Sequence, residues 1–474
     1  MPEELIFASA DRERDIAREL HAVAARLPLI CPHGHVDPAL LAEDQPFGDP
    51  ARLLVVPDHY VTRMLLSQGI PPGRLGVPAR DGSGEPVETD GRAIWRLLAK
   101  HWHLFRGTPS RLWMERTFTG FFDVHTPLRA ETADEIYDAI AARLAEPAFR
   151  PRALFQQFGI ETLATTESPL DDLATHAKLA ADGWGGPGGR VITTFRPDNV
   201  VDMEFAGWAD NVARLGEVAG TDTSGFGGYL DALRLRREAF VAAGATSSDH
   251  GHPTALTVSL PEAEAAELFQ RGLSGRASAR DAELFRAHMI LEFARMSIDD
   301  GLVMQLHPGA ARNHNRWLHG THGRDSGGDI PQATDYVHGL APLLDAYGND
   351  PRLRVVLYTL DEDTFSRELA PLAGGYTALY LGAPWWFLDT PDGLRRFREA
   401  VTDSAGFYNT AGFVDDTRAF CSIPVRHDIA RRVDAAYLAT LVAQGRLPLD
   451  EAAETIADLA YHLPKRIFRL GAEA

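Results

Sequence analysis

Short apolar runs recur along the chain, and longer segments with helical periodicity separate them. Each run is rich in aliphatic or β-branched residues and ends in polar residues, which is typical of a buried parallel strand followed by a helix. Eight such runs predict an α/β fold, a TIM-like (β/α)8 barrel. The candidate strands cover residues 27–30, 161–166, 190–195, 244–248, 302–306, 354–358, 377–381 and 407–413.

The first two runs are separated by about 125 residues, far more than a βα connection needs. Residues 93–100 and 133–140 within this gap are amphipathic with helical spacing, so the gap is expected to form helices. We therefore divide the chain into three segments. They are an N-terminal helix with the first strand (1–37), a helical insertion (38–153), and the remainder of the barrel with C-terminal helices (154–474).

Composition narrows the classes of partner. Hydrophobic residues make up 45% and charged residues 24% of the chain, which are globular proportions, and no run approaches the roughly 20 apolar residues of a membrane span. A formal charge of -19 disfavours nucleic acid, and it requires that any bound anion be held by local arginines. Only two cysteines, Cys31 and Cys421, are present, and the first residues lack the basic and then apolar pattern of a secretory signal. We therefore expect a cytoplasmic protein.

Polar side chains follow the predicted strands, and the carboxyl ends of barrel strands meet at one mouth. His33 and His35 follow the first strand two positions apart, so both imidazoles can face one metal ion. Such a pair alone is equally consistent with histidines that satisfy local hydrogen bonds. The other polar positions are Glu167, Arg196, Asp249 with His250, His307, Asp361, Trp385 with Trp386, and Asp415, Asp416 and Arg418.

Several motifs in combination resemble the uronate isomerases, the glucuronate/galacturonate isomerase branch of the amidohydrolase superfamily. They are HGH at 33–35, DHYVTR at 58–63, TFRPD at 194–198, SDHG at 248–251, LHPGAARN at 306–313, WWF at 385–387, DTR at 416–418, RH at 426–427 and KR at 465–466. The resemblance runs nearly end to end. It implies an amidohydrolase-type barrel with a helical addition after the first strand, in agreement with the periodicity.

The resemblance implies an intramolecular oxidoreductase that isomerises an aldose to a ketose. D-glucuronate would become D-fructuronate, and D-galacturonate would become D-tagaturonate, by proton transfer through a cis-enediol. His33, His35 and Asp416 would bind a divalent metal, expected to be zinc. His59 and Tyr60 would lie near the sugar, and either Tyr60 or Asp416 would transfer the proton; the sequence leaves that choice open.

Arginine suits a substrate carboxylate because its planar fork makes paired hydrogen bonds. Arg196, Arg312 and Arg418 are therefore the candidate carboxylate clamp, although an arbitrary arginine is more often part of a surface ion pair. Trp385 and Trp386 are equally consistent with core packing and with stacking on a sugar ring. Asp249 and His307 complete the candidate substrate contacts, and His307 is also consistent with a buried core histidine.

Two departures from the family pattern suggest a distinct branch. Many members carry Asp-x-His-Cys-His in the first motif, where this chain has Cys31 to His35, and a tryptophan where it has Thr62. One competing interpretation is a metal-dependent hydrolase of the same superfamily, but Asp249 and Asp361 stand where a binuclear hydrolase would carry lysine and histidine. Another is a non-catalytic sugar-acid binding protein. We expect a small hexuronate substrate and a homo-oligomer.

Overall fold

The computed structural model describes residues 5–80, 86–186 and 189–471. Residues 1–4, on which the expectation of no secretory signal partly rests, lie outside this part. The strands are β1 (Leu29–Cys31), β2 (Ile160–Ala164), β3 (Gly185–Gly186), β4 (Gly189–Ile192), β5 (Ser247–His250), β6 (Val303–Leu306), β7 (Ala310–Ala311), β8 (Ile330–Pro331), β9 (Val355–Leu357) and β10 (Leu379–Leu381).

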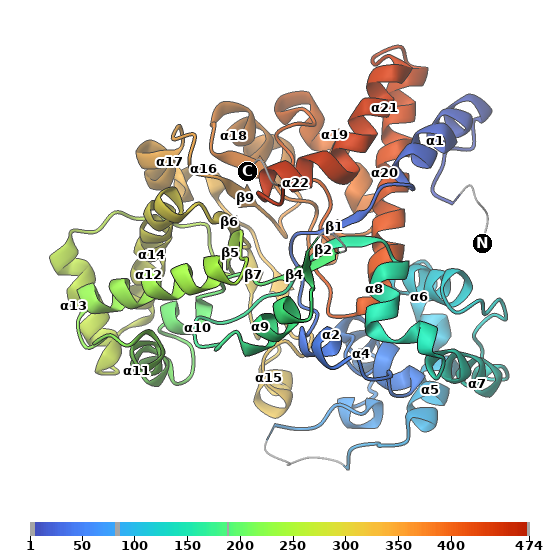
Figure 1. The fold of residues 1–474 in the computed structure, drawn as a ribbon, viewed down its shortest axis with the longest axis horizontal. Coiled ribbons are helices and arrows are strands. Elements are labelled where there is room, and N and C mark those ends of the chain that lie inside the picture. Colours follow the sequence, from blue (N-terminus) through green and yellow to red (C-terminus); the bar gives the residue numbers. More distant parts are fainter. Residues whose placement is uncertain (1–4, 81–85, 187–188, 472–474) are drawn as a thin grey trace.

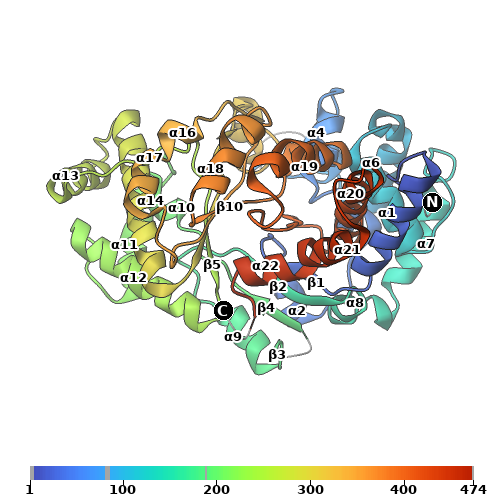
Figure 2. The ribbon, with the colours of Figure 1, turned by 90° about the horizontal axis from the view of Figure 1, so that it is seen from above.

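The parallel strands form a (β/α)8 barrel with helices around it (Figures 1 and 2). One sheet has the order β1-β2-β4-β3 and the other β10-β9-β6-β5. A parallel bridge between Phe195, just after β4, and Ser248 links this segment to β5. A second bridge, between Leu381 and Thr410, places Thr410 at the eighth strand position. The fold class predicted from the sequence is confirmed.

Helices occupy the long connection between β1 and β2. They are α2 (Ala39–Glu43), α3 (Pro50–Leu54), α4 (His59–Leu66), α5 (Gly91–Lys100), α6 (Pro109–Gly120), α7 (Ala133–Leu144) and α8 (Pro151–Gln157). Apolar residues such as Trp95 and Ile140 pack into one buried cluster with Cys31 and Leu163 of the barrel. This shared core fixes the helical segment against β1 and β2.

The other helices pack around the remaining strands, and α1 (Asp11–Ala24) lies beside α20 (Ile423–Ala443) (Figure 1). They are α9 (Ala174–Ala181), α10 (Asp198–Val201), α11 (Trp208–Ala219), α12 (Phe226–Ala242), α13 (Glu262–Leu273), α14 (Ala279–Asp300), α15 (Arg316–His322), α16 (Tyr336–Gly339), α17 (Ala341–Tyr347), α18 (Ala370–Gly375), α19 (Pro391–Ala405), α21 (Leu449–Ala457) and α22 (Leu463–Ile467). Among the described residues, no helix is long and apolar enough to cross a membrane.

Two strand predictions differ from the structure. Asp249 and His250 lie within β5 and do not follow it, since that strand begins at Ser247 and not at Gly244. The run at 407–413 contributes a single bridge residue, Thr410, because residues 406–409 form a turn before it and Gly412, with a φ of +76°, turns the chain out of the extended conformation after it. Any Cβ at this glycine would lie 2.8 Å from the Pro464 ring, so the turn is also closely packed.

Candidate active site

A cavity of about 430 Å³ opens at the carboxyl ends of the barrel strands. Its wall contains every catalytic, substrate and metal residue predicted from the sequence except Asp249, which is fully buried behind it. The predicted residues that line it are His33, His35, His59, Tyr60, Arg196, His307, Arg312, Trp385, Trp386, Asp416 and Arg418. Segments far apart in the sequence therefore converge on one site.

His33, His35 and Asp416 converge at the base of the barrel mouth. The Nε2 atoms of His33 and His35 lie 3.4 Å and 3.2 Å from Asp416 Oδ1. Ligands bound to zinc at about 2.0 Å in tetrahedral geometry lie about 3.3 Å apart, so these separations fit one ion. Asp416 Oδ1 is buried with no hydrogen-bond partner among the described residues, which leaves it available to a metal. The donor set of two imidazoles and a carboxylate suits a divalent transition metal.

Burial and neighbouring charges set the protonation of this trio. Burial alone would raise the pKa of Asp416, but the imidazoles of His33 and His35 hold it well below its usual range. Burial lowers the pKa of His35, which keeps that ring in the neutral form that binds metals. Burial also opposes the charged form of His33, although Asp249 and Asp416 raise its pKa overall.

Asp249 lies behind the cavity wall and holds two of its residues. One carboxylate oxygen is 3.0 Å from Arg196 Nη1, and the other is 2.6 Å from His307 Nδ1. Burial opposes ionisation of Asp249, but Arg196 and His307 hold its pKa well below the usual range. His307 stacks on His33, with ring centroids 4.7 Å apart. Asp249 thus orients the side chains of Arg196 and His307, and it does not face the cavity itself.

His59 and Tyr60 are the first residues of α4, so the helical segment places them over the barrel mouth. Asp58 caps this helix, and its carboxylate accepts a hydrogen bond from the Tyr60 amide at 2.8 Å. The Tyr60 ring contacts the indole of Trp113 edge-on, and the guanidinium of Arg426, which stacks on the same indole, lies 6.0 Å from the Tyr60 ring. Burial and the carboxylate of Asp389 raise the pKa of Tyr60 well above its usual value, so its phenol is protonated at neutral pH. Burial lowers the pKa of His59 to about 4.

The three predicted arginines differ in how far internal carboxylates neutralise them. Arg196 binds both Asp198 and Asp249, and Arg312 binds the buried Asp329 at 3.0 Å. Arg418 is 43% exposed and lies 3.4 Å from the carboxylate of Asp325, on the loop after α15. Arg312 is 3.9 Å from the same carboxylate. Arg418 and Arg312 therefore face each other across one acidic side chain at the rim.

The two tryptophans line the cavity and pack against histidine and arginine side chains of the site. Trp385 is buried and contacts His307 edge-on, whereas Trp386 contacts His59 at a ring distance of 5.6 Å. The Arg312 guanidinium lies 5.5 Å from the Trp386 ring, within the range of a cation–π contact. Both indoles line the cavity, so neither is confined to the core.

Sequence reasoning missed several residues of the cavity wall. Asp325 and Trp113 lie outside any strand end, and nothing in their local sequence marks them. Glu167 follows β2, but its chemistry became visible only in the structure, where burial raises its pKa to about 7. Arg426 forms a buried ion pair of 2.6 Å with Asp389 beside Tyr60. The rule that functional groups gather at strand ends places Glu167 among the candidate polar positions, but it assigns no role to this residue.

Comparison with known proteins agrees with this geometry. The glucuronate isomerase family model matches residues 9–468. The uronate isomerase of Rhizorhabdus wittichii is 57% identical over 469 residues, covering 99% of this chain and 98% of that protein.

Two solved structures are also similar. The crystal structure of glucuronate isomerase from Caulobacter crescentus superposes with a TM-score of 0.96 at 53% identity, over 99% of this chain and 97% of that one. The uronate isomerase of Thermotoga maritima has a TM-score of 0.91 at 28% identity, over 99% of both chains. The chain therefore belongs to the glucuronate isomerase family.

Proposed function

We propose that this isomerase converts a hexuronate aldose to its ketose by moving a proton between C2 and C1. The substrates would be D-glucuronate and D-galacturonate, and the products D-fructuronate and D-tagaturonate. The observation that carries the proposal is the placement of arginines and a metal-ligating trio in one cavity, because a uronate offers a carboxylate at one end and a carbonyl at the other. The hydrolase and sugar-acid binding alternatives are outcomes of the experiment below.

His33, His35 and Asp416 would hold a divalent metal, which we propose to be zinc. The fit rests on their separations of 3.2 Å and 3.4 Å and on the unpartnered Oδ1 of Asp416. A bound metal ion supplies Lewis acidity to carbonyl and hydroxyl oxygens of the substrate. His307 and Asp249 support this trio, since His307 stacks on His33 and Asp249 fixes His307.

We assign the proton acceptor at C2 to Asp416, which would return a proton to C1, and the hydrogen-bond donor to the enediol oxygens to Tyr60. His33 and His35 keep the pKa of Asp416 low in spite of burial, so its carboxylate is ionised and can accept a proton. The raised pKa of Tyr60 keeps its phenol protonated, so it can donate a hydrogen bond to an enediol oxygen. The neutral His59, stacked on Tyr60 with ring centroids 5.0 Å apart, would contact a sugar hydroxyl.

Arg418 and Arg312 would bind the substrate carboxylate. Arg418 is the more exposed of the two, and a guanidinium can form paired hydrogen bonds with a carboxylate. Arg196 is already bound by two acidic side chains, so its part in the clamp would be to orient Asp198 and Asp249. Trp385 and Trp386 would close the apolar side of the sugar. We also propose a cytoplasmic setting, in keeping with two buried, free cysteines.

Incubation of the purified, metal-loaded protein with D-glucuronate, and separately with D-galacturonate, in deuterated water tests the proposal, with C1 and C2 followed by proton NMR. Appearance of D-fructuronate carrying deuterium at C1 is the expected result, because an enediol proton transfer exchanges with solvent. Ketose formation without deuterium would leave the isomerase in place but contradict an exchangeable proton. No conversion of either uronate, together with hydrolysis of a lactone or amide, would favour the hydrolase. Binding without any turnover would favour a sugar-acid binding protein.

A further inference from the structure

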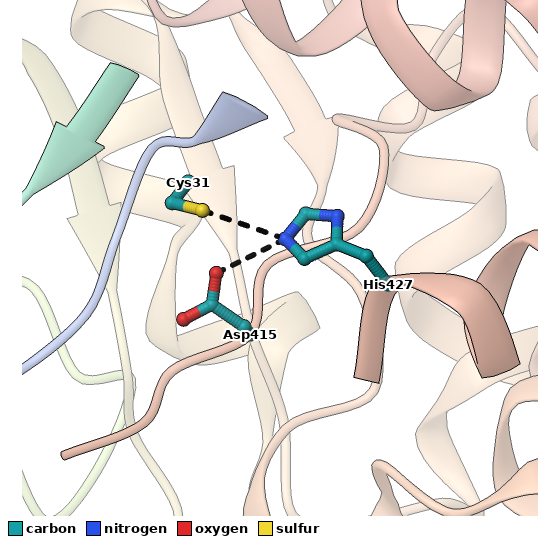
Figure 3. A group of neighbouring side chains, drawn as sticks. All are labelled: Cys31, Asp415 and His427. Atoms are coloured by element: carbon teal, nitrogen blue, oxygen red, sulfur yellow. Dashed lines mark hydrogen bonds and ion pairs between the residues drawn. The ribbon is translucent and has the colours of Figure 1, made fainter. Parts of the chain in front are cut away.

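A second buried trio lies directly behind the proposed metal ligands. It consists of Cys31 at the end of β1, Asp415 in the segment after the eighth strand position, and His427 on α20 (Figure 3). Cys31, Asp415 and His427 are 0%, 1% and 3% exposed. None of the three lines the cavity, so they cannot touch substrate. They nevertheless connect the first strand, the eighth strand position and a C-terminal helix at one point.

The imidazole of His427 lies between the other two side chains. Its Nε2 atom is 3.1 Å from Asp415 Oδ2 and 3.6 Å from Cys31 Sγ (Figure 3). Because an ionised carboxylate only accepts hydrogen bonds, Nε2 donates to Asp415. The ring of Phe413 packs edge-on against the imidazole at 5.1 Å and holds its plane. The three groups therefore restrain one another in a single arrangement.

This arrangement is tied to the metal trio by the chain itself. Cys31 precedes His33 by two residues, and Asp415 immediately precedes Asp416. Asp416 has a φ of +38°, in the left-handed region that residues other than glycine adopt only where their surroundings impose it. The amide of His35 donates to the carbonyl of Thr417 at 3.1 Å, which holds the other side of Asp416. On the side before Asp416, the carboxylate of Asp415 is held by His427, and the Asp415 carbonyl accepts a hydrogen bond of 3.5 Å from Arg426.

We propose that Cys31, Asp415 and His427 form a positioning network that holds Asp416 in its left-handed conformation, with its carboxylate directed at His33 and His35. The inference rests on the metal site of the proposed function. Groups that orient metal ligands without touching the metal change metal affinity by about 10- to 100-fold when they are removed. Loss of the hydrogen bond from His427 should therefore weaken metal binding even though His427 is no ligand.

Zinc affinity, measured on the metal-free full chain by competition with a chromogenic chelator, tests the network. His427→Leu removes the donor and should weaken zinc binding by about 10- to 100-fold. His427→Gln places an amide nitrogen near the position of Nε2 and should restore most of that loss. His288→Leu is the matched control, because His288 is also buried but lies on α14, away from the cavity. It should leave zinc affinity unchanged.

The outcomes separate this inference from the proposed function. If the wild-type chain binds no zinc, the proposed metal site and the network both fail. If the wild-type chain binds zinc and both His427 variants bind it with the wild-type affinity, only the network is overturned. If Cys31→Ser removes a second zinc equivalent from a wild-type chain that binds two, the trio is itself a metal site and no positioning network. His427→Asn, whose shorter amide cannot reach Asp415, replaces His427→Leu if the leucine variant does not fold.

Discussion

Replacing Asp416 by asparagine should abolish turnover while the fold stays intact. Asparagine has the same shape, and it is among the few residues that adopt a left-handed φ readily, so the +38° conformation survives. What changes is the charge between His33 and His35, whose Nε2 atoms lie within 3.4 Å of Oδ1. A general base contributes about 10² to 10⁴ to a rate, or about 3 to 5 kcal/mol, and weakened metal binding adds to that loss.

The assay measures kcat and KM for D-glucuronate at saturating zinc, together with the thermal unfolding midpoint. We expect a fall in kcat of at least about 10³-fold and only a small change in the midpoint. Asp123→Asn is the matched control, since Asp123 is also left-handed, with a φ of +57°, but is highly exposed and away from the cavity. Activity of the Asp416 variant close to that of wild type would refute the assignment of both base and metal ligand.

Three further predictions follow from other parts of the site. Tyr60→Phe removes only the phenolic hydroxyl, so kcat should fall by about 10²-fold or more while zinc stoichiometry, measured by elemental analysis, stays the same. Arg418→Met should raise KM for D-glucuronate about tenfold, because a charge-assisted hydrogen bond contributes about 1.5 kcal/mol, whereas the exposed control Arg395→Met should not. Glu167 has a pKa raised by burial from 4.5 to about 7, so the folded state holds its proton more tightly and stability falls as pH rises between these values. Glu167→Gln should raise the free energy of unfolding by about 3 kcal/mol at pH 8, where burying the ionised carboxylate is costly, and hardly change it at pH 4.5. Urea unfolding at both pH values measures this, and an equal effect at both would contradict the raised pKa.

The sequence predicted the barrel because alternating apolar runs and helices leave few topologies open. It also predicted that His33, Arg196 and Trp385 share a mouth, since parallel strands end at the same edge. The division into segments at 37 and 153 stays a prediction. The exact bounds of each strand were harder to predict, because a shift of one or two residues decides whether Asp249 follows a strand or lies inside it. His59 and Tyr60 came from resemblance alone.

The residues that escaped prediction share a physical cause. Asp325 reaches Arg418 from a loop whose conformation depends on Gly327, where a Cβ would lie 3.3 Å from Arg63 and 3.5 Å from His59. No periodicity encodes such a contact, because it depends on how two distant segments pack. The same holds for the buried pair of Arg426 and Asp389, which the sequence separates by 37 residues.

The origin of each part of the site suggests that metal binding and catalysis depend on different parts of the fold. The proposed metal ligands all come from barrel strand ends, and the buried network behind them joins β1 to α20. His59 and Tyr60 come from the helical segment, which is fixed to the barrel through the apolar core that it shares with β1 and β2. Loosening that core, for example with Trp95→Ala, should therefore lower turnover while zinc affinity is largely kept. Loosening the His427 network should instead lower zinc affinity, so that turnover falls at limiting zinc, since there the metal ligands themselves lose their alignment.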